Sequence, residues 1–141
     1  MIKMDKLIHK KESAFIHEFM DIIKKLQPMV WFFKTHGEPM QVRGVPDILM
    51  CYHGLFVALE FKIMRGGRVS YSPLQEYTIE LINISGGIAV TVWFDNRNGE
   101  VGIGTKRFRD KRLAVDSLII SLDVWASLLK DMKAKIKTLE A

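Results

Sequence analysis

The sequence predicts a single α/β domain in which a mixed central β-sheet is flanked by helices. Two apolar runs on either side of His53-Gly54 indicate a β-hairpin, because Gly adopts the positive φ that a tight turn requires. A helical segment and then a β-branched run follow this hairpin, and a strand reached through a helix lies parallel to the preceding strand. With 141 residues, 48% of them hydrophobic and 26% charged, the chain is long enough to bury one core.

The first predicted helix runs from about Asp5 to Leu26 and is ended by Pro28. Its apolar residues recur with helical period and form one buried stripe, made of Phe15, Ile16, Phe19, Ile22, Ile23 and Leu26. At about 100° per residue, Glu12 lies about 20° from the centre of this stripe, whereas Glu18 lies about 100° away. Glu12 is therefore expected to point inward, either toward a site or as a favourable charge near the N-terminus of the helix.

A strand is predicted from Met29 to Lys34, because this run is short and continuously apolar. The segment 35–44 that follows is too rich in Gly, Pro and polar residues to be regular. It leads straight into the hairpin and is expected to border any site there. Glu38 is then a candidate metal ligand, and His36 and Arg43 are candidate phosphate contacts, unless all three are ordinary loop residues.

The hairpin is expected to bring two carboxylates together. A symmetric turn at His53-Gly54 makes the numbers of cross-strand partners sum to 107, which places Asp47 opposite Glu60. Directly opposed residues have Cβ atoms about 4.5–5.5 Å apart on one face, and like charges there are destabilising unless a cation lies between them. Lys62 shares the face of Glu60, whereas Phe61 points to the core. The pattern predicts a magnesium site, since Mg²⁺ is typically held by one or two carboxylates together with water and substrate phosphate.

Each of these residues also has an ordinary explanation. Pro46-Asp47 is a common turn dipeptide, and Glu60 and Lys62 on a strand often form an exposed ion pair of little energetic value. We favour the site because both features fall at the same end of one hairpin. Beyond Lys62, Arg65-Gly66-Gly67-Arg68 is predicted to be a flexible loop in which Arg65 and Arg68 contact nucleic acid or are merely solvated.

The second predicted helix begins after Ser72 and runs to about Ser85. Ser72 is a good N-cap, Pro73 suits the first turn, and Gln75 completes a capping box, which also explains Gln75 without a catalytic role. Gly86-Gly87 ends the helix. The side chains expected to pack against the sheet are Leu74, Thr78, Leu81 and Ile82.

The C-terminal part is predicted from its turn and cap residues. Ile88 to Phe94 forms the parallel strand, and Asn98-Gly99 marks a hairpin into a strand from Val101 to Thr105. Asp123 is expected to cap a terminal helix that completes the core or forms a dimer face. Between them lies a candidate phosphate-binding patch or solvated loop, whose cations are Lys106, Arg107, Arg109, Lys111 and Arg112.

Composition narrows the class of protein. The net charge of +5 favours a polyanionic partner. The single Cys51 excludes an intramolecular disulfide and fits a reducing compartment. No apolar run approaches 18 residues and the N-terminus lacks a signal-peptide core, so we expect a cytoplasmic location and no membrane partner. One domain is expected over 1–141, with its core at about 5–105 and a basic segment and helix at 106–141.

Five features occur in a characteristic order, namely the helix with Glu12, Gly44-Val45-Pro46-Asp47, Glu60-Phe61-Lys62, the Ser72 to Gln75 helix start and the strand Ile88 to Phe94. This order resembles the PD-(D/E)XK nuclease superfamily. Within it, the Gly-Val-Pro-Asp segment, the Gly66-Gly67-Arg68 loop and the Gly86-Gly87 strand entry are most similar to the VRR-NUC nucleases of phages and mobile elements. Archaeal-type Holliday junction resolvases are similar too. The resemblance covers about Glu12 to Phe94, and nothing after Thr105 contributes.

The resemblance implies a restriction-endonuclease-like core and Mg²⁺-dependent hydrolysis of DNA phosphodiesters, with Mn²⁺ as a substitute and products that carry a 5′-phosphate. The implied metal ligands are Asp47, Glu60 and the Phe61 backbone carbonyl, with Glu12 or Glu38 as a further ligand. Lys62 would orient the attacking water or stabilise developing charge, and Gln75 would hydrogen-bond near Lys62 or the scissile phosphate.

The resemblance also implies a substrate. Similar nucleases act as homodimers on branched DNA, so we expect a structure-specific, Holliday junction resolvase-like endonuclease, located in the host cytoplasm if a phage encodes it. A general or nicking duplex nuclease is the alternative enzyme. A non-catalytic DNA-binding module with the same fold is the alternative from another class.

Overall fold

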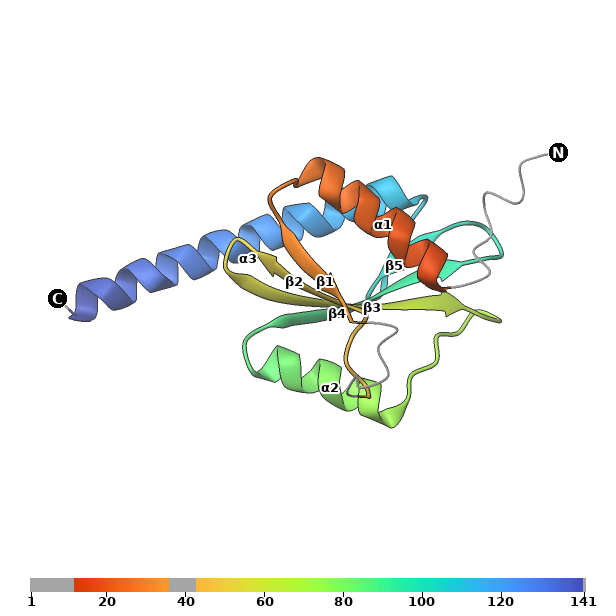
Figure 1. Cartoon of the computed structure of the whole chain (residues 1–141), viewed down its shortest axis with the longest axis horizontal. Coiled ribbons are helices and arrows are strands. Elements are labelled where there is room, and N and C mark those ends of the chain that lie inside the picture. The colour runs from red at the N-terminus through yellow and green to blue at the C-terminus, as the bar shows by residue number, and fades with distance from the viewer. Residues whose placement is uncertain (1–11, 36–42, 141) are drawn as a thin grey trace.

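The computed structural model describes residues 12–35 and 43–140. Within them a six-stranded sheet has the order β1-β2-β3-β4-β5-β6, in which β3 and β4 are parallel and the other neighbours antiparallel. Helices α1 and α3 lie on one face of the sheet and α2 on the other (Figure 1). The elements are α1 Glu12–Leu26, β1 Trp31–Lys34, β2 Ile48–Tyr52, β3 Leu55–Met64, α2 Pro73–Ile84, β4 Ile88–Asp95, β5 Val101–Ile103, β6 Lys106–Phe108 and α3 Lys111–Glu140. The predicted mixed sheet flanked by helices is confirmed.

The hairpin register is the predicted one. Tyr52 pairs with Leu55 and Ile48 with Leu59, so partner numbers sum to 107 along the whole ladder. His53 and Gly54 have φ angles of 46° and 89°, and two positive φ values in a two-residue turn match the right-handed twist of the flanking strands. This turn therefore determines which residues of β2 and β3 meet.

The main core lies between the sheet and helices α1 and α3. On β3, Val57, Leu59 and Phe61 are fully buried. The Phe61 ring meets those of Phe15 and Phe19 from α1, with centroids 5.5 and 5.3 Å apart in edge-to-face arrangements. Because side chains alternate along a strand, this packing directs Glu60 and Lys62 to the opposite face, toward α2.

The start of α2 is as predicted, but its packing is not. The capping box is complete, since the Ser72 side chain accepts from the Gln75 amide at 3.1 Å and the Gln75 side chain accepts from the Ser72 amide at 3.0 Å. The expected burial of Leu74 and Leu81 is wrong, because both are more than 40% exposed. Instead, polar side chains join the helix to the sheet: Asn83 exchanges two hydrogen bonds with the backbone of Ala89, at 2.8 and 3.1 Å.

The segment Arg65 to Arg68 is a closed turn rather than the predicted flexible loop. Arg65 and Arg68 exchange two backbone hydrogen bonds of 2.9 and 3.0 Å. Gly66 and Gly67 both have positive φ, as the two central residues of such a turn require. The two arginines thus stand side by side at the end of β3, and both are exposed.

Two predictions about the C-terminal part are wrong. The basic segment is not a loop, because Lys106–Phe108 forms the edge strand β6 and α3 begins at Lys111. Asp123 is not an N-cap, because it lies inside the 30-residue α3 and accepts a hydrogen bond from the Tyr52 hydroxyl. The cap is Asp110, whose carboxylate accepts from the Leu113 amide at 2.9 Å. No Gly or Pro interrupts residues 111–140, so nothing in the sequence ends the helix earlier.

Helix α3 is longer than the body of the domain. At about 1.5 Å per residue it spans about 45 Å, and its C-terminal half projects beyond the sheet (Figure 1). Its N-terminal half buries Ala114, Val115, Leu118 and Leu122. Across the described part of the chain, no helix combines the length and the apolar composition needed to span a membrane.

Candidate active site

Asp47 is placed by the hairpin next to the middle of β3. It directly precedes β2, and the ladder with β1 continues past it, because the Thr35 amide donates to the Asp47 carbonyl at 2.9 Å. Its side chain reaches across to β3, where Oδ2 accepts a hydrogen bond from the Phe61 amide at 2.8 Å. The carboxylate of Asp47 thus lies against the backbone that carries Glu60, as the register predicts.

Glu60 is a buried acid whose ionisation is unfavourable. It is only 3% exposed. Its pKa is raised from 4.5 to about 7, chiefly by burial and then by the charge of Asp47 and, to a smaller extent, that of Glu12, against the opposing effect of Lys62. Two carboxylates and one ammonium therefore share this face of the sheet, with an excess of negative charge.

Lys62 and Gln75 complete the cluster. The Lys62 Nζ lies 3.5 Å from Glu60 Oε2 and donates to Gln75 Oε1 at 2.9 Å. The Gln75 amide in turn donates to Glu60 Oε2 at 3.0 Å. The sequence allowed either a capping role or a site role for Gln75. Its side chain makes both kinds of contact, because Oε1 accepts from the Ser72 amide of the capping box as well as from Lys62. The capping box thereby fixes the side chain that holds Glu60 and Lys62.

Two residues of the cluster were missed by the sequence analysis. The Lys62 Nζ lies 5.5 Å from the centroid of the Tyr71 ring, and the Tyr71 hydroxyl donates to Thr91 Oγ1 at 2.7 Å. Thr91 is the β4 partner of Glu60 in the parallel ladder. The register of β4 against β3 would have identified Thr91, but the sequence does not specify that register. No signal in the sequence singled out Tyr71.

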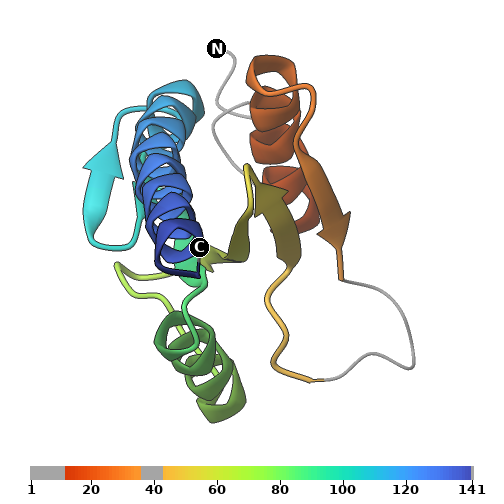
Figure 2. The same ribbon diagram turned by 90° about the vertical axis from the view of Figure 1, so that its left-hand side faces the viewer.

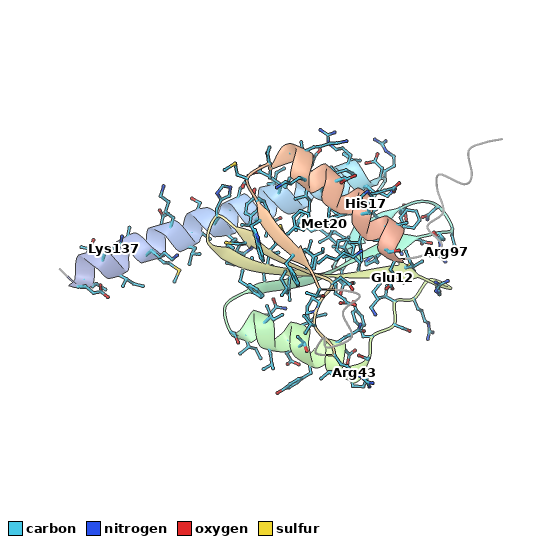
Figure 3. All side chains as sticks on the ribbon, in the orientation of Figure 1. Glu12, His17, Met20, Arg43, Arg97 and Lys137 are labelled. Carbon is cyan, nitrogen blue, oxygen red and sulfur yellow. The ribbon has the colours of Figure 1, made fainter. Side chains whose placement is uncertain are left out.

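Glu12 is closer to solvent than predicted. It is the first residue of α1 and is exposed, and Figure 3 shows it at the end of that helix. Its charge nevertheless contributes to the raised pKa of Glu60. Glu38 and His36 lie outside the described residues. Arg43 is exposed and precedes the segment that packs on α2 (Figure 3).

The position of the segment before Asp47 requires a glycine at residue 44. Gly44 has a φ of +81°, and a Cβ there would lie 2.6 Å from Leu74 Cγ and 3.1 Å from the Leu74 carbonyl carbon and oxygen. Only glycine lets the segment approach the first turn of α2 this closely. The contact connects the element that carries Asp47 to the helix that carries Gln75.

We expect Gly44→Ala to lower the stability of the fold, because the methyl group collides with Leu74 and separates Asp47 from Gln75. Strain of this kind costs about 1–3 kcal/mol. Thermal unfolding measures the loss. Gly66→Ala is the matched control, since Gly66 also has positive φ but a Cβ there meets nothing within 4 Å. Equal losses in both variants would contradict the proposed role of the Gly44 contact.

Besides Arg43, the described cations that are predicted to contact phosphate come from two segments. Arg65 and Arg68 lie at the end of β3, and β6 and the start of α3 lie at the opposite side of the sheet from β1 (Figure 2). Arg107 pairs with Glu100 at 2.9 Å, and Lys111 pairs with Glu18 at 2.9 Å. The other cations of this segment are Lys106, Arg109 and Arg112, all exposed, and Arg112 lies 3.7 Å from Asp116.

A second buried acid lies at the end of β4. Asp95 is fully buried, and hydrogen bonds from Arg97, including one of 2.8 Å from the guanidinium, lower its pKa to about 2. Arg107 lies 3.6 Å from the same carboxylate and 4.8 Å from the centroid of the Trp93 ring. Arg97 and Arg107 neutralise the charge of Asp95, so this acid stabilises the fold. Glu60 differs, because it shares Lys62 with a second acid, Asp47.

The donor set at Asp47 and Glu60 fits a hard divalent cation. Among the residues that the structure describes, no group of three His, Cys, Asp and Glu side chains is placed to hold a metal ion. Mg²⁺ uses few protein ligands, often one or two carboxylates, and takes its other oxygens from water and phosphate. A cation beside Glu60 would also offset the charge excess that raises its pKa. Comparison with protein-family models and with curated proteins finds no match for this chain.

Proposed function

We propose that this protein is a Mg²⁺-dependent endonuclease with a restriction-endonuclease-like core that hydrolyses DNA phosphodiesters in branched substrates. The observation that supports the proposal most strongly is the raised pKa of Glu60 beside Asp47. Burying one acid next to another destabilises the fold, and titratable groups with pKa values shifted in this way are concentrated at functional sites. Lys62 and Gln75 contact this acid, which agrees with the roles that the resemblance to the PD-(D/E)XK nucleases implies for them.

Each residue of the cluster has a separate role in the proposed reaction. Asp47, Glu60 and the Phe61 carbonyl would hold the ion, which when bound supplies a water of lowered pKa and neutralises charge on the phosphate. Lys62 is oriented by Gln75 Oε1, so its ammonium is held where it can contact the attacking water or a phosphate oxygen. Gln75 also holds the Glu60 carboxylate at 3.0 Å and limits its rotation.

The proposed substrate is branched DNA, bound by a homodimer. The chain has a net charge of +5. The exposed Arg65 and Arg68 directly follow β3, the strand that carries Glu60. Two sites in a symmetric dimer can cut two strands of a four-way junction. An exposed apolar stripe for a subunit contact begins at Trp125 and continues along the projecting half of α3 through Leu128, Met132 and Ile136.

The test compares cleavage of a labelled four-way junction with cleavage of the matching linear duplex, in Mg²⁺ and in chelator. We expect paired cuts confined to the junction that require Mg²⁺ and fall at least about a hundredfold in Asp47→Ala. Asp131→Ala removes an exposed carboxylate from α3 and serves as the control. Equal cutting of both substrates would leave a general nuclease. Binding without cutting by the unaltered protein would leave a DNA-binding module.

A further inference from the structure

A row of exposed aromatic side chains lies on the same face of the sheet as Asp47 and Glu60. Cross-strand partners share a face, and residues two apart on a strand return to it. Moving along the strands away from the Asp47–Glu60 pair, the next row on this face is Phe33, Leu49 and Ala58, and the row after it is Trp31, Cys51 and Phe56. We call Trp31, Phe33, Leu49, Cys51 and Phe56 the aromatic platform.

The aromatic platform is open to solvent. Trp31, Phe33 and Phe56 are 61%, 48% and 47% exposed. The Trp31 and Phe33 rings are within 9° of parallel, with centroids 6.4 Å apart. Among the described residues, α2 covers this face over β3 and β4, and β1 lies at the edge of the sheet away from that helix (Figure 2). Exposed aromatic rings grouped in this way are typical of a binding surface.

We infer that the aromatic platform stacks unpaired bases of the DNA strand that enters the proposed active site, an inference that rests on the proposed function. Many proteins bind single-stranded nucleic acids by stacking the bases on exposed aromatic side chains of a sheet, because every base has a face that can stack. Residues two apart on a strand are about 6.6 Å apart, so the Trp31 row lies about 13 Å from the carboxylates. About four stacked nucleotides span that distance.

The dimensions of the aromatic platform argue against a second copy of the chain as its occupant. An aromatic side chain buries about 150–250 Å² in full, so three that are about half exposed offer about 300 Å². A stable subunit interface buries about 800 Å² on each partner. None of the platform residues is acidic, and the chain is basic, so a DNA strand meets no repulsion there. Bases that are freed at a branch point can use this surface, whereas bases stacked inside a duplex cannot.

The inference is tested with DNA binding in chelator, where no cleavage occurs. The probe is a single-stranded oligonucleotide, and a fully paired duplex is measured beside it. We expect Trp31→Ala/Phe33→Ala to weaken single-strand binding about tenfold to a hundredfold and duplex binding much less. Tyr77→Ala removes a ring of similar exposure, 58%, from α2 and is the control. Trp31→Tyr/Phe33→Tyr keeps the rings and is expected to retain binding, and the duplex binding that Trp31→Ala/Phe33→Ala keeps excludes misfolding as the cause of its loss.

A second readout locates the bases. A fluorescent base analogue placed within about four nucleotides of the cut is expected to be quenched on binding, and the quenching is lost in Trp31→Ala/Phe33→Ala. Unchanged single-strand affinity in this variant would overturn the inference even if the enzyme cleaves. Loss of a dimer on sedimentation, with DNA binding retained, would identify the platform as a subunit contact and also overturn it. Single-strand binding by a protein that cleaves nothing would refute the proposed function while leaving the platform.

Discussion

Glu60→Gln is expected to make the protein more stable at pH 8 while abolishing cleavage. The folded protein binds the Glu60 proton more tightly than the unfolded chain does, because the pKa rises from 4.5 to about 7 on folding. The stability contributed by protonated Glu60 is therefore fully present below pH 4.5 and is lost as the pH rises through about 7. A neutral glutamine avoids this loss, and its oxygen still accepts from Gln75.

The expected gain at pH 8 is about 1–3 kcal/mol, less than the full pKa shift implies because Gln also forgoes the contact with Lys62. For a chain of this length that gain raises Tm by about 3–10 °C. Thermal unfolding in chelator measures the gain at pH 8 and its disappearance at pH 4.5. Glu76→Gln, at an exposed position of α2, is the control. A variant that is destabilised equally at both pH values would show that Glu60 does not strain the fold.

The site was more predictable than the helices around it, and the reason lies in the range of the interactions involved. The register of Asp47 against Glu60 depends only on the turn at His53-Gly54, a local feature that the sequence shows directly. The position of Gln75 likewise follows from the capping box that begins α2. Both are short-range rules, so a residue pattern alone is enough to place these side chains.

The errors arise where tertiary contacts decide. Leu74 and Leu81 stay exposed because α2 is rotated to direct Gln75 and Asn83 at the sheet, and no local rule sets that rotation. Asp123 suits an N-cap by residue type, but its partner is the Tyr52 hydroxyl, 71 residues away in the sequence. Burial and the Asp123 charge raise the pKa of Tyr52 and show how closely the hairpin packs on α3.

The cations of the segment 106–112 also have partners that the sequence does not indicate. Arg107 and Lys111, which are predicted to contact phosphate, pair with Glu100 and Glu18. Long side chains can pair with residues that are distant in the sequence and become neighbours only in the folded chain. The aromatic platform was missed for a related reason: the run 29–34 is apolar enough to be core, and one face of it is exposed because α2 packs on β3 and β4 rather than on β1.

Mg²⁺ is expected to stabilise the folded protein at pH 8 through Asp47 and Glu60, and this effect can be measured without any DNA. A ligand that binds only the folded state adds about 1.4 kcal/mol at ten times its Kd, which raises Tm by about 3–6 °C here. Because the ion must displace the Glu60 proton, the stabilisation is expected to weaken as the pH falls below about 7. Titration of Mg²⁺ against Tm at pH 8 and pH 6 measures both effects.

The variants separate a specific site from general salt effects. Asp47→Ala and Glu60→Gln are each expected to lose the Mg²⁺-dependent rise in Tm, whereas Asp131→Ala keeps it because that exposed carboxylate lies on α3. In wild type the bound ion also offsets the burial and the repulsion by Asp47 that raise the pKa of Glu60, so Mg²⁺ removes most of the stability difference between wild type and Glu60→Gln at pH 8. A Tm that rises equally in all four proteins would mean that the ion acts elsewhere, and the two acids would then need another explanation.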